Sequence, residues 1–277
     1  MPSGVITTQV YQLNLPLADD TEHFWKPYQM FEGSTHVVEG LTCHSSVLSP
    51  GHSPHPPHSH EEEELLIALQ GEAELIISDS PCSTYARTER LSPGSFVYYP
   101  ARQHHTIHNP GVSPITYLMF KWRGAEFVCS RQSQTRIVKF SNFPPDNSKS
   151  FHACPILEQS TGYLEKLHVH LSTMQPGSGY APHIDAYDVA ILVLAGQIET
   201  LNKIVGPHGV IYYSAGQSHG LRNVGACPAQ YLVFEFHAPT VRSGQPLKSK
   251  TGRQLFADML THFGVLEPAR RVRNFLR

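Results

Sequence analysis

Residues 52–64, HSPHPPHSHEEEE, concentrate side chains that can bind metal ions. Four histidines and three prolines lead directly into four glutamates. Imidazole nitrogens and carboxylate oxygens together suit divalent transition metals such as Mn, Fe, Co, Ni, Cu and Zn. The other interpretations are a disordered low-complexity run and a polyhistidine surface segment, and neither needs a partner elsewhere in the chain. A closed metal site does need one, so the rest of the sequence distinguishes these interpretations.

The spacing inside this segment favours three of its residues as ligands. On a strand, side chains two or four residues apart project from the same face, which groups His58, His60 and Glu64. A second segment, GSFVYYPARQHHTIHN (94–109), supplies the further ligand as His104, His105 or His108. This partner favours a metal site over a surface segment.

The elements that position these ligands occur twice along the chain. LTCHSSVLSPG (41–51) parallels LHVHLSTMQPG (167–177), and ELLIALQGEAEL (64–75) parallels VAILVLAGQIET (189–200). NPGVSPITYLMFKW (109–122) then parallels NVGACPAQYLVFEF (223–236). Three collinear matches indicate a tandem duplication.

Each repeat consists of short apolar runs separated by glycine and proline, a pattern typical of β-strands joined by turns. Helical periodicity is confined to TGRQLFADMLTHFGVL (251–266). We therefore predict an all-β protein with two small barrels or sandwiches and a C-terminal helix. The expected ranges are 1–125 for the first barrel, 126–160 for an inter-barrel linker around the polar stretch 141–150, 161–240 for the second barrel and 241–277 for the helix and a basic tail.

Composition excludes several classes of partner. The net charge is −2 and the pI is near 6.8, so neither nucleic acid nor an anionic membrane surface is an expected partner. The five cysteines are odd in number and lack CxxC spacing, which favours free thiols over a disulfide framework. No signal peptide or long apolar run is evident, so a cytoplasmic location is expected.

The two ligand segments resemble the paired signature motifs of the cupins. The first motif is matched by Gly51, His58, His60, Glu64 and Gly71, and the second by Gly94, Pro100, His105 and Asn109. Arg102 departs from the glycine that the family prefers at a turn. The resemblance implies a double-stranded β-helix (jelly-roll) barrel in which His58, His60, Glu64 and His105 bind one metal. Together with the duplication, it implies a bicupin.

Other polar residues of these segments then fall into supporting or surface positions. Two turn histidines are expected in solvent, with the rim of the metal site as the alternative: His52 and His55. Two glutamates of opposite parity to Glu64 are expected on a solvated face: Glu61 and Glu63. Glu62 shares the ligand parity but not the motif spacing, so it is a weaker candidate. His104 and His108 are out of phase with His105 and are expected at the surface or behind the ligands.

The second repeat retains only part of the motif. Its corresponding residues include His183, Asp185, Val189 and His219, so one histidine has become an aspartate and the glutamate has become a valine. Asp188 is adjacent but of opposite parity. His183, Asp185 and His219 form a candidate second site with two imidazoles and one carboxylate, and the alternative is a degenerate barrel retained for packing. The nearby GQSHG (216–220) matches a nucleophile-elbow pattern, but a turn and a strand follow it instead of a helix, so Ser218 is not a candidate nucleophile.

These features predict a metal-dependent enzyme acting on a small organic molecule, with Glu64 as both ligand and catalytic proton acceptor. The expected cofactor is one divalent ion among Fe, Mn, Cu, Ni and Zn, with Fe favoured. A dioxygenase-type oxidoreductase is favoured because open coordination positions suit joint binding of substrate and dioxygen. The alternatives are an isomerase or decarboxylase, a non-catalytic module that binds a small molecule such as a sugar, and a metal-free storage-type bicupin. Pairing through exposed sheet edges makes a homodimer an expectation.

Overall fold

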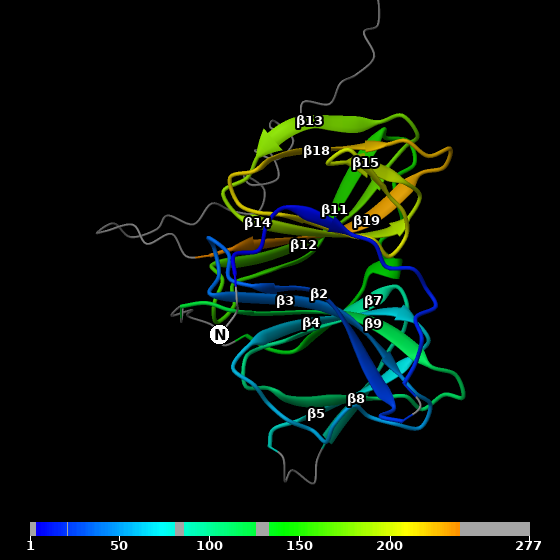
Figure 1. The fold of residues 1–277 in the computed structure, drawn as a ribbon, viewed down its shortest axis with the longest axis vertical. Coiled ribbons are helices and arrows are strands. Elements are labelled where there is room, and N and C mark those ends of the chain that lie inside the picture. The colour runs from blue at the N-terminus through cyan, green and yellow to red at the C-terminus, as the bar shows by residue number, and fades with distance from the viewer. Residues whose placement is uncertain (1–3, 21, 81–85, 126–132, 239–277) are drawn as a thin grey trace, which may run out of the picture.

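The short apolar runs of both repeats form antiparallel β-strands (Figure 1). The computed structural model describes residues 4–20, 22–80, 86–125 and 133–238. Its strands are arranged in two six-stranded sheets, one four-stranded sheet and one three-stranded sheet. The only helical element among the described residues is a 3-10 turn, η1 (Phe140–Asn142).

The first barrel combines a six-stranded sheet with the three-stranded sheet. The large sheet has the order β10-β7-β4-β9-β3-β2 and the small one β6-β5-β8. These strands are β2 (Trp25–Gly33), β3 (Gly40–Leu48), β4 (Glu63–Gln70), β5 (Ala73–Ser78), β6 (Ala86–Leu91), β7 (Ser95–Tyr99), β8 (His104–His108), β9 (Ile115–Arg123) and β10 (Arg136–Lys139).

The second barrel repeats this arrangement. Its large sheet has the order β1-β17-β14-β19-β12-β11 and its small sheet β13-β18-β15-β16. The strands are β1 (Gln9–Tyr11), β11 (Phe151–Gln159), β12 (Lys166–Met174), β13 (Gly179–Ile184), β14 (Asp188–Ala195), β15 (Ile198–Thr200), β16 (Lys203–Val205), β17 (Val210–Tyr213), β18 (Ser218–Asn223) and β19 (Ala229–His237).

The two large sheets face each other across the middle of the molecule (Figure 1). One buried apolar cluster joins side chains of both, including Leu65, Phe120, Leu192 and Phe234. Separate clusters fill the interior of each barrel. The central strands are therefore covered on both faces, which explains why β4 is an almost continuous apolar run instead of an alternating one.

The strand that precedes each repeat completes the other barrel. β1 lies ahead of the first repeat but pairs with β17 of the second, and β10 lies ahead of the second repeat but pairs with β7 of the first. β7 and β17 occupy equivalent positions in their sheets. Each pairing covers the edge of a large sheet, so the two repeats exchange edge strands reciprocally.

The all-β fold class with two tandem barrels is confirmed. Two details differ from the expected ranges. Residues 9–11 belong to the sheet of the second barrel. The range 126–160 contains β10 and β11, because the polar stretch between the repeats is shorter than the segment expected to link them. The expected C-terminal helix and basic tail lie outside the described residues.

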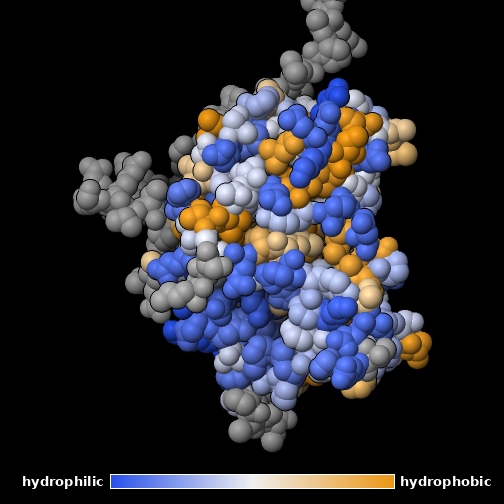
Figure 2. Space-filling view, in the orientation of Figure 1, coloured by the Kyte–Doolittle hydropathy of each residue, from blue (hydrophilic) through white to orange (hydrophobic). Residues whose placement is uncertain are grey.

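The described part of the chain contains no helix with the length and apolarity needed to cross a membrane. Figure 2 shows mainly hydrophilic residues over the first barrel and a pronounced hydrophobic patch over the second. Among the described residues, Cys43, Cys154 and Cys227 are free thiols, as expected.

Candidate metal centre

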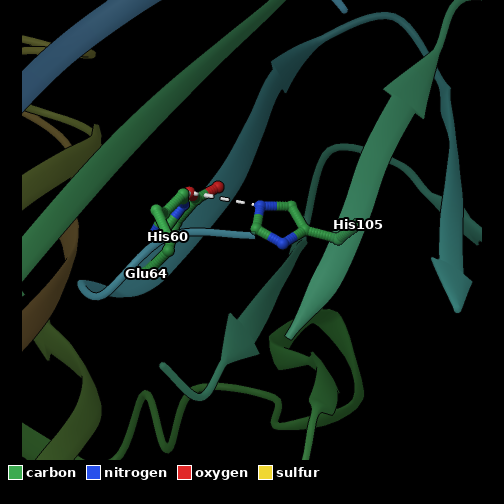
Figure 3. Close-up of side chains that lie close together, drawn as sticks. All are labelled: His60, Glu64 and His105. Carbon is green, nitrogen blue, oxygen red and sulfur yellow. Dashed lines mark hydrogen bonds and ion pairs between the residues drawn. The ribbon is translucent and has the colours of Figure 1, made fainter. Parts of the chain in front are cut away.

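Three of the four expected ligands converge at one end of the first barrel (Figure 3). Glu64 is the second residue of β4, His60 lies just ahead of that strand, and His105 is on β8 of the opposite sheet. The Oε2 atom of Glu64 lies 3.1 Å from Nε2 of His60 and 3.4 Å from Nε2 of His105. Two imidazoles and a carboxylate thus direct donor atoms toward a common point.

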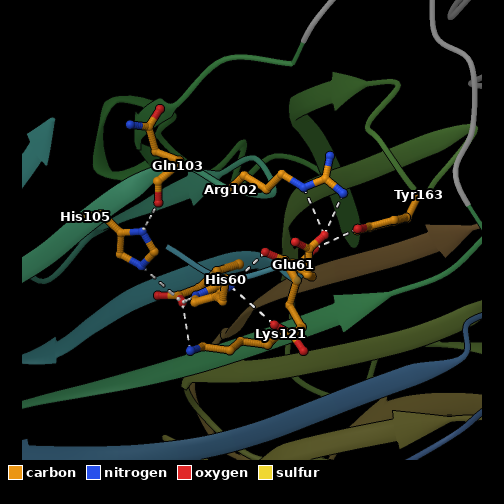
Figure 4. Close-up of polar contacts among 9 residues, drawn as sticks. His60, Glu61, Arg102, Gln103, His105, Lys121 and Tyr163 are labelled. Carbon is orange, nitrogen blue, oxygen red and sulfur yellow. Dashed lines mark hydrogen bonds and ion pairs between the residues drawn. The ribbon is translucent and has the colours of Figure 1, made fainter. Parts of the chain in front are cut away.

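Backbone carbonyls hold both imidazoles in this orientation (Figure 4). Nδ1 of His60 donates to the carbonyl of Glu62 at 2.9 Å, and Nδ1 of His105 donates to the carbonyl of Gln103 at 2.8 Å. With Nδ1 occupied, Nε2 is the atom left to face Glu64. Histidines that bind metals in proteins are commonly fixed through the second ring nitrogen in this way.

His58 adjoins the group without belonging to its tightest part. Its backbone forms a bridge with His105, and its ring centroid lies 5.3 Å from that of His105 and 5.4 Å from that of His60. Its Nδ1 is buried and has no hydrogen-bond partner within the described ranges. Burial, together with the neighbouring histidines and Lys121, lowers the pKa of His58 to about 4, so the ring is neutral at neutral pH and able to bind a metal.

Glu64 is a buried carboxylate that stays ionised. Its residue is 2% exposed, and burial alone would raise its pKa. Hydrogen bonds from His105 and His60, and the charge of Lys121, instead hold the pKa of Glu64 well below its usual range. Nζ of Lys121 lies 3.4 Å from Oε2 of Glu64. The donor set of three imidazoles and one anionic oxygen fits a divalent transition metal.

One feature around His105 recurs in the second barrel. The ring of Tyr99 stacks on His105 with centroids 4.1 Å apart, and Tyr213 stacks on His219 at 4.0 Å. These tyrosines lie against the histidines and limit ring rotation.

The motif departure at Arg102 leaves the turn intact. Arg102 has a φ of 64° and donates its N–H to the carbonyl of His60, and Gly216 has a φ of 82° and donates in the same way to Asp185. A positive φ explains the preference for glycine here. Arg102 also pairs with the exposed Glu61 at 2.7 Å.

The expectation of a solvated Glu63 is wrong. Glu63 is fully buried, because the outer face of β4 packs against the second barrel instead of facing water. Its carboxylate accepts hydrogen bonds from Nε1 of Trp122 at 2.8 Å, the hydroxyl of Tyr98 at 3.0 Å and the N–H of Gly162 at 2.6 Å. Burial raises the pKa of Glu63, and these hydrogen bonds oppose that rise. Glu63 therefore links the two repeats.

The other candidates occupy supporting positions. The ring of His55 lies 3.8 Å from that of His58, which places His55 at the rim of the site, the less favoured alternative. His52 stacks on Phe24 instead. The carboxylate of Glu62 lies 3.5 Å from Nδ1 of His60, on the side away from Glu64. His104 and His108 are half-buried on the face of β8 opposite to His105.

The second barrel brings its three motif residues together as well. Oδ2 of Asp185 lies 3.4 Å from Nε2 of His183 and 3.4 Å from Nε2 of His219. Burial opposes ionisation of Asp185, but hydrogen bonds from both histidines lower its pKa. Val189 provides no ligand, and Asp188 is buried on the opposite face of β14, where it accepts the N–H of Ala215. Ser218 lies on β18, a strand, which agrees with its exclusion as a nucleophile.

Sequence reasoning missed two groups. Lys121 interrupts the apolar strand β9 and points into the first barrel, and an inward charge in such a strand was the available signal. His168, His170 and Glu235 form a third cluster, on β12 and β19 of the second barrel. Their alternating spacing was visible in LHVHL, but their proximity depends on strand pairing.

Comparisons with known proteins agree with this geometry. The Cupin domain family matches residues 45–121. A search of curated proteins found no match.

Solved structures resemble the chain over most of its length. A putative glyoxylate-induced protein from Pseudomonas aeruginosa has a TM-score of 0.65 at 13% identity, covering 90% of this chain and 95% of the other. AerE from Microcystis aeruginosa has a TM-score of 0.58 at 14% identity, covering 83% and 97%. A variant of the oxalate decarboxylase OxdC of Bacillus subtilis has a TM-score of 0.58 at 12% identity, covering 86% and 79%. At these identities the likeness establishes the fold. Residues 45–121 of the first barrel therefore match the cupin domain family, and the second barrel repeats the same strand arrangement.

Proposed function

We propose that the first barrel is the active site of a metal-dependent enzyme that acts on a small organic molecule. The observation that carries this proposal is the convergence of His60, Glu64 and His105 on one point, with His58 adjoining them. Storage-type barrels have no need for a buried anionic carboxylate among imidazoles. Such a group is costly to desolvate, and a bound cation offsets that cost.

The chain's own residues have distinct roles in this proposal. His60 and His105 bind through Nε2, and the hydrogen bonds of their Nδ1 atoms prevent the rings from turning away. When bound, a divalent metal supplies Lewis-acid polarisation of a substrate oxygen. Four protein ligands leave positions for exogenous molecules on a metal that prefers five or six ligands. Glu64 is ionised, so its carboxylate can accept a proton from a substrate that binds beside it.

Dioxygen-dependent oxidation is the favoured reaction, with Fe as the favoured metal. Imidazoles and one carboxylate suit Fe(II), which when bound would supply the redox chemistry for reaction of a substrate with dioxygen. Glu64 then serves as the base that deprotonates a hydroxyl or an acidic C–H of the substrate.

Isomerisation or decarboxylation is a second candidate, favoured by Lys121. Its ammonium group lies 3.4 Å from Glu64 and its side chain is 24% exposed, so it can also contact a bound molecule. A cation at this position stabilises a carboxylate or a developing enolate. This arrangement favours acidic substrates under either candidate reaction. A homodimer formed through sheet edges is part of the proposal and is checked by light scattering.

The test begins with metal content. Protein purified without a histidine tag is analysed by mass spectrometry of its metals, and its melting is followed on addition of Fe, Mn, Cu, Ni and Zn. Absence of bound metal together with unchanged melting overturns the proposal.

Turnover is then measured in two ways. Dioxygen uptake is recorded with a panel of diols, diketones and hydroxy acids, and product formation from keto acids is followed without dioxygen. Uptake that depends on metal supports the oxygenase, and metal-dependent turnover without uptake supports the second candidate. Bound metal with ligand binding but no turnover in either assay identifies a non-catalytic binding module and overturns the enzyme proposal. Glu64→Gln and the exposed Glu61→Gln form a matched pair, of which only the first should abolish turnover.

A further inference from the structure

His168, His170 and Glu235 line the interior of the second barrel on two neighbouring strands. His168 and His170 are two residues apart on β12, and His168 lies directly opposite Glu235 on β19. All three are less than 9% exposed, and one donor atom of each lies within 4.8 Å of the others. None of them corresponds to a cupin motif position, so this cluster is distinct from both motif-derived groups.

Each member is held by a partner behind it. Nδ1 of His168 lies 2.9 Å from Oε2 of Glu158, and Nδ1 of His170 lies 2.9 Å from Oγ of Ser172. Nε2 of His237 lies 2.7 Å from the second carboxylate oxygen of Glu235. The Nε2 atom of each ring on β12 is therefore left for the interior, and Nε2 of His170 lies 3.7 Å from Oε1 of Glu235. This is the orientation found for His60 and His105 in the first barrel.

The carboxyl group of this strand pair lies on different strands in the two barrels. In the first barrel Glu64 on β4 lies opposite Lys121 on β9. At the equivalent pair in the second barrel, Val189 on β14 lies opposite Glu235 on β19. The motif carboxyl group is lost from β14, but the carboxyl group of Glu235 replaces the lysine on β19. This strand pair of the second barrel therefore still carries one carboxyl group, that of Glu235, and has no counterpart of Lys121.

The cavity beside this cluster suits an ion better than an organic molecule. A cavity of about 30 Å³ is lined by His170 and Glu235 of this cluster and by His183, Asp185 and His219 of the motif-derived group, and His168 lies beside it. A site for one water or ion needs roughly 10–15 Å³, whereas pockets for organic ligands occupy about 300–1,000 Å³.

We propose that the second barrel binds a divalent transition-metal ion between His168, His170 and Glu235. Two imidazoles and one carboxylate suit Zn, Co, Mn or Fe(II), with water completing the coordination. The site does not depend on the activity of the first barrel. His183, Asp185 and His219 share the cavity but are not its principal ligands.

The experiment uses the full chain with the first site removed by His60→Ala and His105→Ala. Cobalt(II) titrations record the number of ions bound per chain and the visible absorption of nitrogen-coordinated cobalt. We expect one ion per chain to remain. Absence of a remaining ion overturns the proposal, and it does so whether or not the first barrel proves to be an enzyme.

Single substitutions in that background identify the ligands. Glu235→Gln, which keeps the shape of the side chain, and His168→Gln, which removes the imidazole, should each weaken cobalt binding about tenfold or more. Glu199→Gln, an exposed carboxylate on β15 of the same barrel, is the matched control and should have no effect. Asp185→Asn should weaken binding by less than about threefold, since Asp185 is outside the proposed ligand set. A loss in Asp185→Asn equal to or greater than that in Glu235→Gln assigns the ion to the motif residues and overturns the proposal. Circular dichroism melts in chelator verify that each variant folds. If either Glu235→Gln or His168→Gln fails to fold, the other still tests the ligand assignment.

Discussion

Glu64 and Lys121 lie directly opposite each other on β4 and β9, with Nζ of the lysine 3.4 Å from Oε2 of the glutamate. This ion pair is inside the candidate metal centre, so the ammonium group competes with a metal cation for the same oxygen. Lys121 thus opposes metal binding while providing a positive charge for an acidic substrate.

Replacing Lys121 by methionine should tighten metal binding. The substitution removes a like charge next to the bound cation and frees Oε2 of Glu64, so we expect a Kd for zinc that is lower by about three- to tenfold. Calorimetric titration of metal-free protein measures it. Lys139→Met, an exposed lysine on β10, is the control. Weaker zinc binding in Lys121→Met would falsify this description of the pair.

The two adjacent histidines of β8 should differ sharply in their effect on the metal. His105 directs Nε2 toward Glu64, whereas His104 projects from the other face of the strand. We expect His105→Ala to weaken metal affinity about a hundredfold and His104→Ala to leave it unchanged. Metal occupancy after dialysis measures both, and equal losses would contradict the assignment of His105.

Glu63 should matter for stability and not for metal binding. Removing its carboxylate leaves three buried donors without an acceptor, from Trp122, Tyr98 and Gly162. We expect Glu63→Ala to lower the free energy of unfolding by about 3–5 kcal/mol. Glu61→Ala, which removes an exposed ion pair with Arg102, should cause no measurable change. Urea denaturation in the presence of chelator compares the two, and a stable Glu63→Ala would contradict the role of Glu63 as a link between the repeats.

His44 should contribute to the acid sensitivity of the metal-free protein. Burial, with a smaller effect of Lys121, lowers the pKa of His44 from 6.5 to about 4. Between these values the unfolded chain binds the proton and the folded chain does not, so stability is lost as the pH falls from 6.5 toward 4. The loss amounts to about 3 kcal/mol at most. His44→Gln should flatten the dependence of unfolding free energy on pH in this window, whereas His23→Gln, at an exposed position, should not. Parallel curves for His44→Gln and the unaltered protein would refute this contribution.

The two repeats should not fold well when separated. Each large sheet covers the other, and β1 and β10 each complete the opposite barrel. Residues 1–125 expressed alone would expose the buried apolar face of β4 and leave the edge of β7 uncovered. We expect dye binding typical of exposed apolar surface and loss of near-ultraviolet circular dichroism. A cooperative melt of the isolated repeat would show that the exchange is dispensable.

The candidate metal ligands could be picked out from the sequence because their signal is local. The spacing of His58, His60 and Glu64, with His105 on a later strand, follows from a short motif and strand alternation. The prediction assumed that His58, His60 and Glu64 lie on one regular strand. In the structure β4 begins only at Glu63, so His60 precedes the strand and still lies beside Glu64. The backbone of His60 is held in place by a hydrogen bond from the N–H of Arg102, in the turn ahead of β8, to the carbonyl of His60.

The sequence by itself determined the duplication, the all-β class and the candidate ligands of the two motif-derived groups, since these depend on composition and on spacing over a few residues. Only the tertiary structure decided which strand faces are covered and which strands are neighbours. It buried Glu63 against the second barrel, placed β1 and β10 in each other's barrels, and set Glu235 opposite His168. Strand alternation specifies two faces but not what lies against each of them. That is settled by pairings between segments far apart in the chain, which the large apolar area between the two sheets stabilises.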